Sequence, residues 1–249
     1  MKFFDSYKRF YETSITSPFP DRLNGRYEAI IEKNATSISG AKVLDIASHD
    51  GRWSFAALQA GAKFVKGIEP RQELITNAIN TFSSYKINPA RYAFICGSIF
   101  DCLVDESFDV VLCLGYFYHT IRHAELLDRI ERTGAKLVVI DTEVVPPITQ
   151  NPLNYSNDPR LVFDNPYAIQ LLTESVDDQQ MASVDTLSRD GRTLVGRPSK
   201  EAIRYMSSHF GYDISAYDWS DHFQRNPEHV SSMSDYHQKW RETFYLSRL

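Results

Sequence analysis

The stretch KVLDIASHDGRWSFAALQAGAKFVKGIE, residues 42–69, decides the fold of this chain. Its residues 42–46 are a short apolar run that predicts a strand, residues 53–60 predict a helix, and residues 64–68 predict a second strand. Small residues stand in the turn between the first strand and the helix, where backbone can approach a ligand closely: Ala47, Ser48 and Gly51. The stretch therefore predicts a β-α-β unit with a binding turn after its first strand.

The same alternation continues as far as residue 141. Helices are expected at residues 73–82 and 124–132, and strands at residues 92–96, 108–114 and 136–141. Strands that alternate with helices of this length indicate βαβ units. The continuous apolar run at residues 110–114, VVLCL, is typical of a strand buried on both faces. We expect an α/β fold of the Rossmann-like kind, a doubly wound and mostly parallel sheet with helices on both faces.

Segments outside this alternation are expected to cover the sheet. Residues 1–40 are interpreted as N-terminal cap helices, with a break at Pro18 and Pro20 and a helix at residues 27–33. Residues 41–249 form the main domain, within which residues 146–198 are interpreted as a lid or substrate loop because the alternation stops there. Further on, a helix is expected at residues 200–209, and the tail 217–249 adds a strand, an insertion and a final strand near residues 243–246.

Composition limits the classes of function. The 249 residues carry a net charge of −5, which does not favour a nucleic-acid or membrane-surface binder, since such proteins usually have a basic excess. No apolar stretch reaches the roughly 20 residues that span a bilayer, and the first residues lack the apolar core of a signal peptide. The three scattered cysteines give no disulfide framework. We expect a cytoplasmic protein, monomeric or homodimeric, whose partner is a small molecule.

The second strand ends in Glu69, which is expected to bind a nucleoside. In open α/β sheets ligands bind at the carboxyl ends of the strands. A carboxylate at the end of the second strand accepts hydrogen bonds from the two hydroxyls of a ribose. Glu69 follows Gly51 by 18 residues, close to the spacing of about 20 expected for such a unit.

A family resemblance rests on four motifs in the order of the chain. Residues 43–51, VLDIASHDG, resemble the first motif of class I methyltransferases that use S-adenosylmethionine (SAM), and Glu69 resembles their ribose acid. Residues 97–101 and 108–115 resemble the third and fourth motifs. The resemblance covers residues 40–145 and implies that SAM is the cofactor. It implies these cofactor-binding residues: Asp45, Ala47, Ser48, Gly51, Glu69, Ser98, Ile99 and Leu114. Ala47 and His49 depart from it, because the family often has glycine there.

NAD is the competing cofactor, and a cofactor-free Rossmann-like fold is the alternative to both. The turn 47–51 has one glycine, whereas a pyrophosphate-binding turn usually has three. Asp45 and Asp50 would also repel a pyrophosphate. SAM carries a sulfonium and an ammonium instead of phosphate, so the acidic turn favours SAM.

The segment after the fourth motif is expected to face the acceptor. Tyr118-His119 resembles an element of many small-molecule methyltransferases and of transferases that modify the wobble uridine of tRNA. His119 is our candidate general base, because histidine titrates near neutral pH. The alternative is that it hydrogen-bonds a backbone carbonyl. His123 and His49 are weaker candidates. The residues expected to bind the acceptor are Arg26, Tyr116, Tyr118 and Asp141.

Polar and aromatic residues in the predicted lid, at residues 154–160 and Tyr167, suit a hydroxylated ring such as a sugar. We therefore expect methylation of a small molecule, at an oxygen of a sugar or another hydroxylated acceptor. A tRNA-modifying transferase and a non-catalytic SAM-binding subunit are the alternatives. Asp141 and Glu143, with Asp164 or His222, offer a divalent metal site, but no tight ligand cluster is present and no metal is expected.

Overall fold

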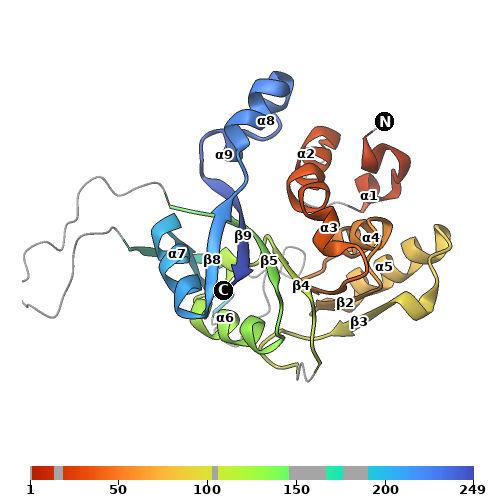
Figure 1. Cartoon of the computed structure of the whole chain (residues 1–249), viewed down its shortest axis with the longest axis horizontal. Helices are drawn as coiled ribbons and strands as arrows, with labels where there is room; N and C mark the ends of the chain where they lie inside the picture. The colour runs from red at the N-terminus through yellow and green to blue at the C-terminus, as the bar shows by residue number, and fades with distance from the viewer. Residues whose placement is uncertain (1, 14–18, 103–105, 146–166, 176–189) are drawn as a thin grey trace, which may run out of the picture.

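The computed structural model describes residues 2–13, 19–102, 106–145, 167–175 and 190–249. Its centre is a seven-stranded sheet in the order β3-β2-β1-β4-β5-β9-β8 (Figure 1). The strands are β1 (Lys42–Ile46), β2 (Phe64–Glu69), β3 (Tyr92–Cys96), β4 (Val110–Leu114), β5 (Leu137–Glu143), β8 (Tyr212–Ala216) and β9 (Arg241–Arg248). The first five pair in parallel, and β9 runs antiparallel to both β5 and β8. The predicted doubly wound, mostly parallel sheet is confirmed.

Helices cover both faces of this sheet because each carries one apolar stripe. The buried apolar side chains form two main core clusters, one on each face of the sheet. On one face lie α4 (Arg52–Gln59) and α5 (Gln72–Ser84), whose Phe55 and Phe82 are fully buried in the first of these clusters. On the other face lie α6 (His123–Arg132) and α7 (Lys200–His209), whose Leu126 and Ile203 are fully buried in the second. The continuous apolar run of β4 separates the two clusters and is buried along its whole length.

The N-terminal segment is helical, and its main helix overlaps the predicted one but is shifted toward the N-terminus. Its elements are the 3₁₀ helices η1 (Phe3–Ser6) and η2 (Glu32–Asn34) and the α-helices α1 (Arg9–Glu12), α2 (Pro20–Ile30) and α3 (Ala35–Ile38). The helix expected at residues 27–33 begins seven residues earlier and ends at Ile30. Pro20, interpreted as a break, is the first residue of this helix, where a missing N–H costs nothing and the fixed φ favours the helix.

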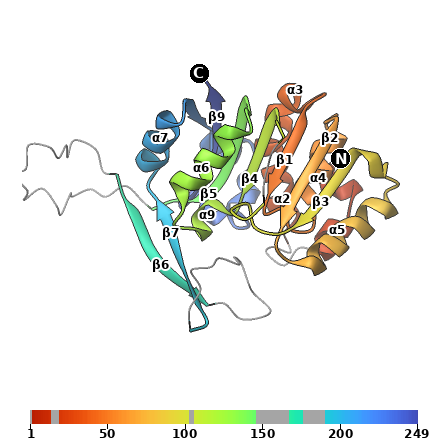
Figure 2. The same cartoon turned by 90° about the horizontal axis from the view of Figure 1, so that it is seen from below.

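The predicted lid at 146–198 contains an unexpected β-hairpin. Its strands β6 (Ile169–Ser175) and β7 (Arg192–Pro198) pair antiparallel in a sheet of their own, which projects from the main sheet (Figure 2). The prediction of a loop is wrong for these two segments. Residues 146–166 and 176–189, with Asp164 and the stretch 154–160, lie outside the described residues.

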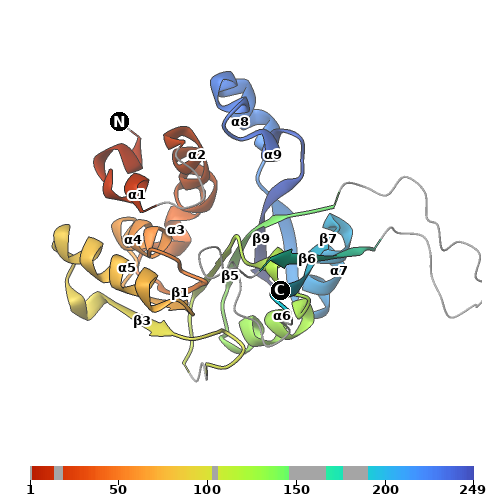
Figure 3. The same cartoon turned by 180° about the vertical axis from the view of Figure 1, so that it is seen from behind.

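The β8–β9 connection forms a helical insertion, residues 217–240. It contains α8 (Trp219–Arg225), η5 (Pro227–Val230) and α9 (Ser234–His237). The strand predicted in the tail after residue 217 in fact begins at Tyr212. The insertion rises beside α2 (Figure 3), and Arg22 of α2 makes two hydrogen bonds of 2.6 and 2.7 Å to Asp235. Two segments about 200 residues apart therefore cover the sheet together.

Cap and insertion lie at the edge where the parallel strands end. The carboxyl-terminal residues of β5 pair with the first residues of β9, with Glu143 opposite Arg241. The chain leaves β4 at the same edge, through Gly115 and the 3₁₀ helix η4 (Phe117–His119). Since ligands bind at this edge in open α/β sheets, we expect the functional site there.

Candidate functional site

The turn after β1 adopts a backbone that favours glycine at three alternate positions. Ala47 has φ 55°, His49 has φ 53° and Gly51 has φ 74°, all in the left-handed region. A side chain at Gly51 would lie 3.0 Å from both Ala78 and Phe94. Ala47 and His49 thus keep the glycine-type turn at a cost of about 1–2 kcal/mol each. The departure from the glycine pattern changes the residues but not the path of the backbone.

Glu69 joins this turn to the end of β2. Its carboxylate is almost fully buried and accepts a hydrogen bond of 2.9 Å from the backbone N–H of His49. The Nε of Arg71 donates to the other carboxylate oxygen at 2.8 Å. Around Glu69 lies a hollow that Ala47, Ser98 and Ile99 help to line, so residues of three predicted motifs meet there.

Tyr116, predicted to bind the acceptor, also lines this hollow. Leu114 ends β4 close by, with its side chain 8% exposed. The side-chain hydroxyl of Ser48 is buried and makes no hydrogen bond with the described residues. Gly67 of β2 admits no side chain, because a Cβ there would lie 2.5 Å from Phe94 and 2.7 Å from the Ser48 hydroxyl.

Asp45 near the end of β1 and Asp50 in the turn have pKa values shifted in opposite directions. Burial raises the pKa of Asp45 to about 7, against a hydrogen bond of 2.6 Å from the Ser54 hydroxyl that lowers it. Burial opposes the charge of Asp50 too, but the guanidinium of Arg52, with hydrogen bonds of 2.7 and 2.8 Å, holds the pKa of Asp50 far below its usual range. Asp50 is therefore ionised and paired with Arg52, whereas Asp45 titrates near neutral pH.

His49 also presents an unsatisfied polar atom. Its Nδ1 lies 3.2 Å from the Arg52 Nη2, while its Nε2 is buried and has no hydrogen-bond partner among the described residues. Buried polar atoms are normally paired. An orphaned nitrogen in this turn, together with the glycine-type backbone and the Glu69 carboxylate, fits a bound polar nucleoside such as SAM.

Asp141, predicted to bind the acceptor, lies at the centre of a buried ion-pair network. Its carboxylate is fully buried and accepts hydrogen bonds from Arg26 (3.2 Å), Arg241 (3.1 Å), Tyr236 (2.8 Å) and Thr243 (2.9 Å). Burial alone would raise the pKa of Asp141, but the two arginines lower it below its usual range. The four partners come from three elements, α2, α9 and β9, so this carboxylate on β5 joins all three to the sheet edge.

Tyr118 and His119 follow β4 at the edge of that network. The Tyr118 hydroxyl accepts a hydrogen bond of 3.0 Å from Arg241, which also lies over its ring at 4.9 Å. Among the described residues, no backbone carbonyl accepts a hydrogen bond from the His119 side chain. Instead, its Nδ1 lies 2.6 Å from the Glu174 Oε2, on the hairpin strand β6. The weaker candidate His123 lies 3.0 Å, through Nε2, from the carbonyl oxygen of Gly196, and links α6 to β7.

No group of three or more potential metal ligands occurs in the part of the chain that the structure describes. His222, considered as a ligand beside Asp141, lies instead 3.1 Å from His229, nitrogen to nitrogen, and pairs with Glu28 at 3.2 Å. Asp164 lies outside the described residues. The carboxylate oxygens of Asp141 accept hydrogen bonds from arginine and hydroxyl groups instead.

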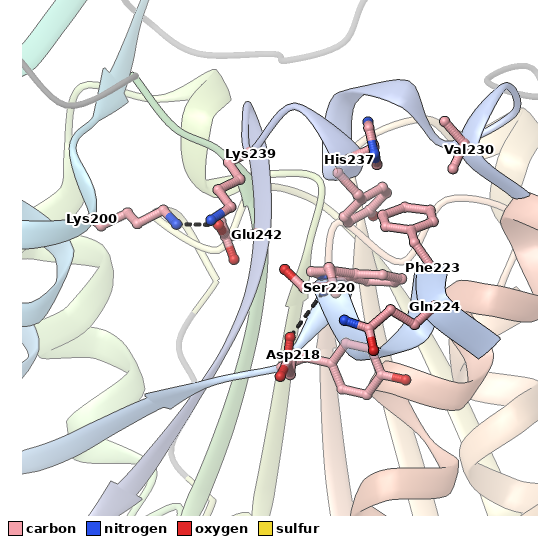
Figure 4. Close-up of a pocket in the computed structure, with 12 residues that line it drawn as sticks. Lys200, Asp218, Ser220, Phe223, Gln224, Val230, His237, Lys239 and Glu242 are labelled. Atoms are coloured by element: carbon pink, nitrogen blue, oxygen red, sulfur yellow. Dashed lines mark hydrogen bonds and ion pairs between the residues drawn. The ribbon is translucent and has the colours of Figure 1, made fainter. Parts of the chain in front are cut away.

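A second cavity, of about 470 Å³, lies beside the insertion and away from the turn (Figure 4). Phe223 and His237 form part of its wall, and Lys200 pairs with Glu242 at its rim. Asp218 accepts from the backbone N–H of Ser220 at 2.9 Å and begins α8. The cavity has no lining residue in common with the hollow at Glu69.

Part of the chain matches a known family model. Residues 43–135 match the family model described as a methyltransferase domain. The match begins with the turn motif and ends before β5, so it contains the hollow at Glu69, Tyr118 and His119. No curated protein matches the sequence.

Solved structures of methyltransferases share the fold of the whole described chain. A complex of DhpI with S-adenosylhomocysteine (SAH) has 15% identity, covers 98% of this chain and 94% of its own, and gives a TM-score of 0.58. The N-terminal domain of EvdMO1 with SAH and D-fucose has 14% identity, covers 94% and 85%, and gives 0.62. Magnesium protoporphyrin IX methyltransferase from Synechocystis PCC 6803 with bound SAM has 12% identity, covers 99% and 91%, and gives 0.56. The class I methyltransferase fold of this chain is thus shown.

Sequence reasoning missed four residues of this site. Arg71, Glu174, Tyr236 and Arg241 hold Glu69, His119 and Asp141 in place. Arg71 stands two residues after Glu69 and was within reach of motif reasoning. The other three come from segments without a motif, and no local pattern identifies them.

No helix in the described part of the chain is long and apolar enough to cross a bilayer.

Proposed function

We propose that the chain transfers a methyl group from SAM to an oxygen of a hydroxylated small molecule, with a sugar as the leading class of acceptor. One observation carries the proposal. In a methyltransferase domain, the Glu69 carboxylate is joined at 2.9 Å to the backbone of the glycine-type turn at His49. A buried carboxylate at the end of the second strand beside such a turn is how this kind of sheet holds the ribose of a nucleoside.

The residues proposed for SAM are those at the turn and around Glu69. Glu69 would accept from the ribose hydroxyls, and the hollow beside Ser98 and Ile99 would hold the adenine. Ionised Asp45 would complement the positive charges of the methionine part. When bound, SAM supplies the methyl group on a sulfonium, which leaves as a neutral thioether. Leu114, Ala47, Ser48 and Gly51 shape the wall and allow the close approach.

His119 is proposed to take the proton from the acceptor hydroxyl as the oxygen attacks. It lies three residues after Tyr116, which lines the hollow, and its backbone N–H donates to the Tyr116 carbonyl oxygen at 2.8 Å. General-base help of this kind contributes about 10²–10⁴ in rate. Tyr116 and Tyr118 are proposed as walls for the acceptor. Asp141 is buried and fully hydrogen-bonded, which supports a positioning role for it. It holds Arg26 and Arg241, and Arg241 in turn donates a hydrogen bond to the Tyr118 hydroxyl.

A sugar acceptor has support from the comparisons at the level of chemical class. The EvdMO1 domain was crystallised with D-fucose, and the Synechocystis protein is named for a porphyrin. Both are small molecules. The net charge of −5 remains unfavourable for a nucleic-acid acceptor.

The test begins with the cofactor. Calorimetry with SAM and with SAH is expected to show one site, and Glu69→Ala is expected to abolish measurable binding. Glu174→Gln, far from Glu69 along the chain, serves as the matched control and should bind SAM as the wild type does. Absence of SAM binding to the wild-type protein would refute the proposal as a whole.

The acceptor is tested separately, by methyl transfer from radiolabelled SAM. D-fucose and a panel of other monosaccharides are expected to give labelled product, and bulk tRNA is not. Transfer to tRNA alone would replace the acceptor class but not the cofactor. His119→Ala should lower turnover at least 100-fold with SAM binding unchanged; unchanged turnover would remove His119 from its role as base.

A further inference from the structure

The histidine proposed as base has an acidic partner that no motif of the sequence indicated. We infer that Glu174 is a positioning residue that holds the His119 imidazole with its proton on Nδ1, so that Nε2 faces the acceptor. The inference deepens the proposed function and rests on it. It assigns a role to the hairpin β6–β7, which lies outside the matched methyltransferase domain.

The contact itself is close and shielded. The Nδ1 of His119 and the Oε2 of Glu174 are 2.6 Å apart, and 14% and 26% of the two side chains are exposed. An ionised carboxylate only accepts, so Nδ1 donates in this contact. The Nε2 of His119 makes no hydrogen bond with the described residues, and its ring packs on Tyr118 at 4.0 Å between centroids. The basic lone pair is therefore left on Nε2.

The fold fixes Glu174 in this position through the hairpin. Glu174 lies opposite Thr193 in the β6–β7 pairing. Strand β7 is attached to the domain at Gly196, whose carbonyl oxygen lies 3.0 Å from the Nε2 of His123. A Cβ at Gly196 would lie 2.9 Å from the His123 ring and 3.2 Å from the Thr120 carbonyl, so only glycine permits this approach. Two residues that follow His119 in the chain, Thr120 and His123, thus contact β7, the strand that pairs with β6 and its Glu174.

The chemistry follows from this arrangement. When the acceptor oxygen forms its bond to the methyl carbon, its proton passes to Nε2 and the imidazole becomes an imidazolium. The Glu174 carboxylate then faces a full positive charge and stabilises it. The proton later leaves Nε2 to solvent, which restores the same tautomer. No further reactant is needed. A carboxylate on the far nitrogen is what keeps a histidine base in the productive tautomer and orientation.

The rival explanation is that the pair only docks the hairpin onto η4. Both explanations predict that loss of the contact loosens the hairpin. They differ in what a partner without charge can do. A glutamine carbonyl oxygen can still accept from Nδ1, whereas a methionine of similar length offers no comparable acceptor.

The test is ¹⁵N nuclear magnetic resonance of the histidine side chains with SAH bound, which needs no acceptor. Assignment uses His119→Gln. At pH 8 the wild type and Glu174→Gln are expected to carry the His119 proton on Nδ1. Glu174→Met is expected to lose that preference and show Nε2–H or a mixture. Glu125→Gln, which removes an exposed carboxylate from α6, is the control and leaves the spectrum of His119 unchanged.

Turnover of the best monosaccharide from the panel gives a second readout. Glu174→Met should lower kcat about 10- to 100-fold with the KM for SAM unchanged, and Glu174→Gln should recover part of that loss. A wild-type His119 protonated on Nε2, or a tautomer that is the same in all variants, would overturn the inference. The inference would also be overturned if Glu174→Gln and Glu174→Met lost the same amount of kcat and the same amount of thermal stability. Failure of the proposed function is recognised independently, by absence of SAH binding.

Discussion

The hydroxyl of Tyr236 donates a 2.8 Å hydrogen bond to the carboxylate of Asp141, 95 residues earlier in the chain. Neither group is reached by water, since Asp141 is 0% and Tyr236 1% exposed. The bond links the end of β5 to the helical insertion, and Arg26 adds the cap to the same carboxylate. The walls above the sheet edge are therefore tied to one buried charge.

Tyr236→Phe should lower the free energy of unfolding by about 1.5–3 kcal/mol, because it removes a buried hydrogen bond to a charged group. Asp141→Asn should cost more, about 3–5 kcal/mol, because it leaves Arg26 and Arg241 facing an uncharged amide. Urea denaturation measures both. Tyr205→Phe is the control at an exposed tyrosine and should change the free energy by less than about 0.5 kcal/mol. A Tyr236→Phe variant as stable as the control would mean that the Tyr236–Asp141 hydrogen bond does not stabilise the fold.

Gly51 and Gly40 have the same φ, +74°, but only Gly51 is enclosed. Gly40→Ala should cost about 1–2 kcal/mol, the strain of a left-handed alanine. Gly51→Ala should cost a further 1–3 kcal/mol, roughly the cost of overpacking, because its Cβ meets Ala78, Phe94 and Phe82. Thermal unfolding of the two variants separates the cost of backbone strain from the cost of overpacking. Equal losses would mean that Phe94 and Phe82 move aside.

Asp45, with its pKa raised to about 7 from 3.8, makes stability depend on pH in a definite direction. The folded protein holds this proton more tightly than the unfolded chain does. Its contribution is thus present at low pH and is lost as the pH rises from about 4 to about 7. The free energy of unfolding of the wild type, minus that of Asp45→Asn, should fall over this range. A difference that rises with pH would show that Asp45 is ionised throughout.

The same group predicts proton release when SAM binds. Cationic SAM favours the ionised carboxylate, so at pH 6.5 binding should expel part of a proton. Calorimetry in two buffers of different ionisation enthalpy measures this number. It should approach zero in Asp45→Asn, and an unchanged number in that variant would assign the release to another group.

Arg71 competes for the carboxylate that is proposed to hold the ribose, with its Nε 2.8 Å from Glu69. Arg71→Ala should tighten SAH binding about two- to tenfold, equivalent to roughly 0.4–1.4 kcal/mol. Arg91→Ala, whose guanidinium bonds the Ala62 carbonyl oxygen, is the matched control and should leave the affinity unchanged. Weaker binding in Arg71→Ala would mean that the guanidinium stays and contacts the cofactor.

The parts of the fold that sequence predicted are those in which local pattern decides structure. The apolar runs of β1, β2, β4 and β5 indicate buried strands from their own residues alone, and the turn motif lies between β1 and β2. The hairpin was missed because β6 is mostly exposed and has no buried residue, with Leu171 59% accessible, so it lacks the apolar run of a buried strand. α2 was misplaced because Pro20 was interpreted as a break when it begins the helix.

The sequence named the motif residues of the proposed site but not the residues that contact them. Glu69 was identified because the strand order places it at the ligand edge. The contact of Glu174 with His119 spans 55 residues and that of Arg241 with Asp141 spans 100, and both depend on packing that no spacing rule encodes. Asp141 was expected to bind the acceptor, and no sequence pattern indicated the arginine and tyrosine side chains that hydrogen-bond it.

The joining of α2 to the insertion also sets an order of events during synthesis. Arg26 emerges from the ribosome early, with Asp141 after it, whereas Tyr236 and Arg241 emerge about 100 residues later still. Until then the sheet can form its parallel half, but the Asp141 carboxylate lacks three of its four hydrogen-bond partners, Tyr236, Arg241 and Thr243. A nascent chain of about 230 residues should therefore fold its nucleotide half while its acceptor half stays open to proteases, and translation of the last strand closes it.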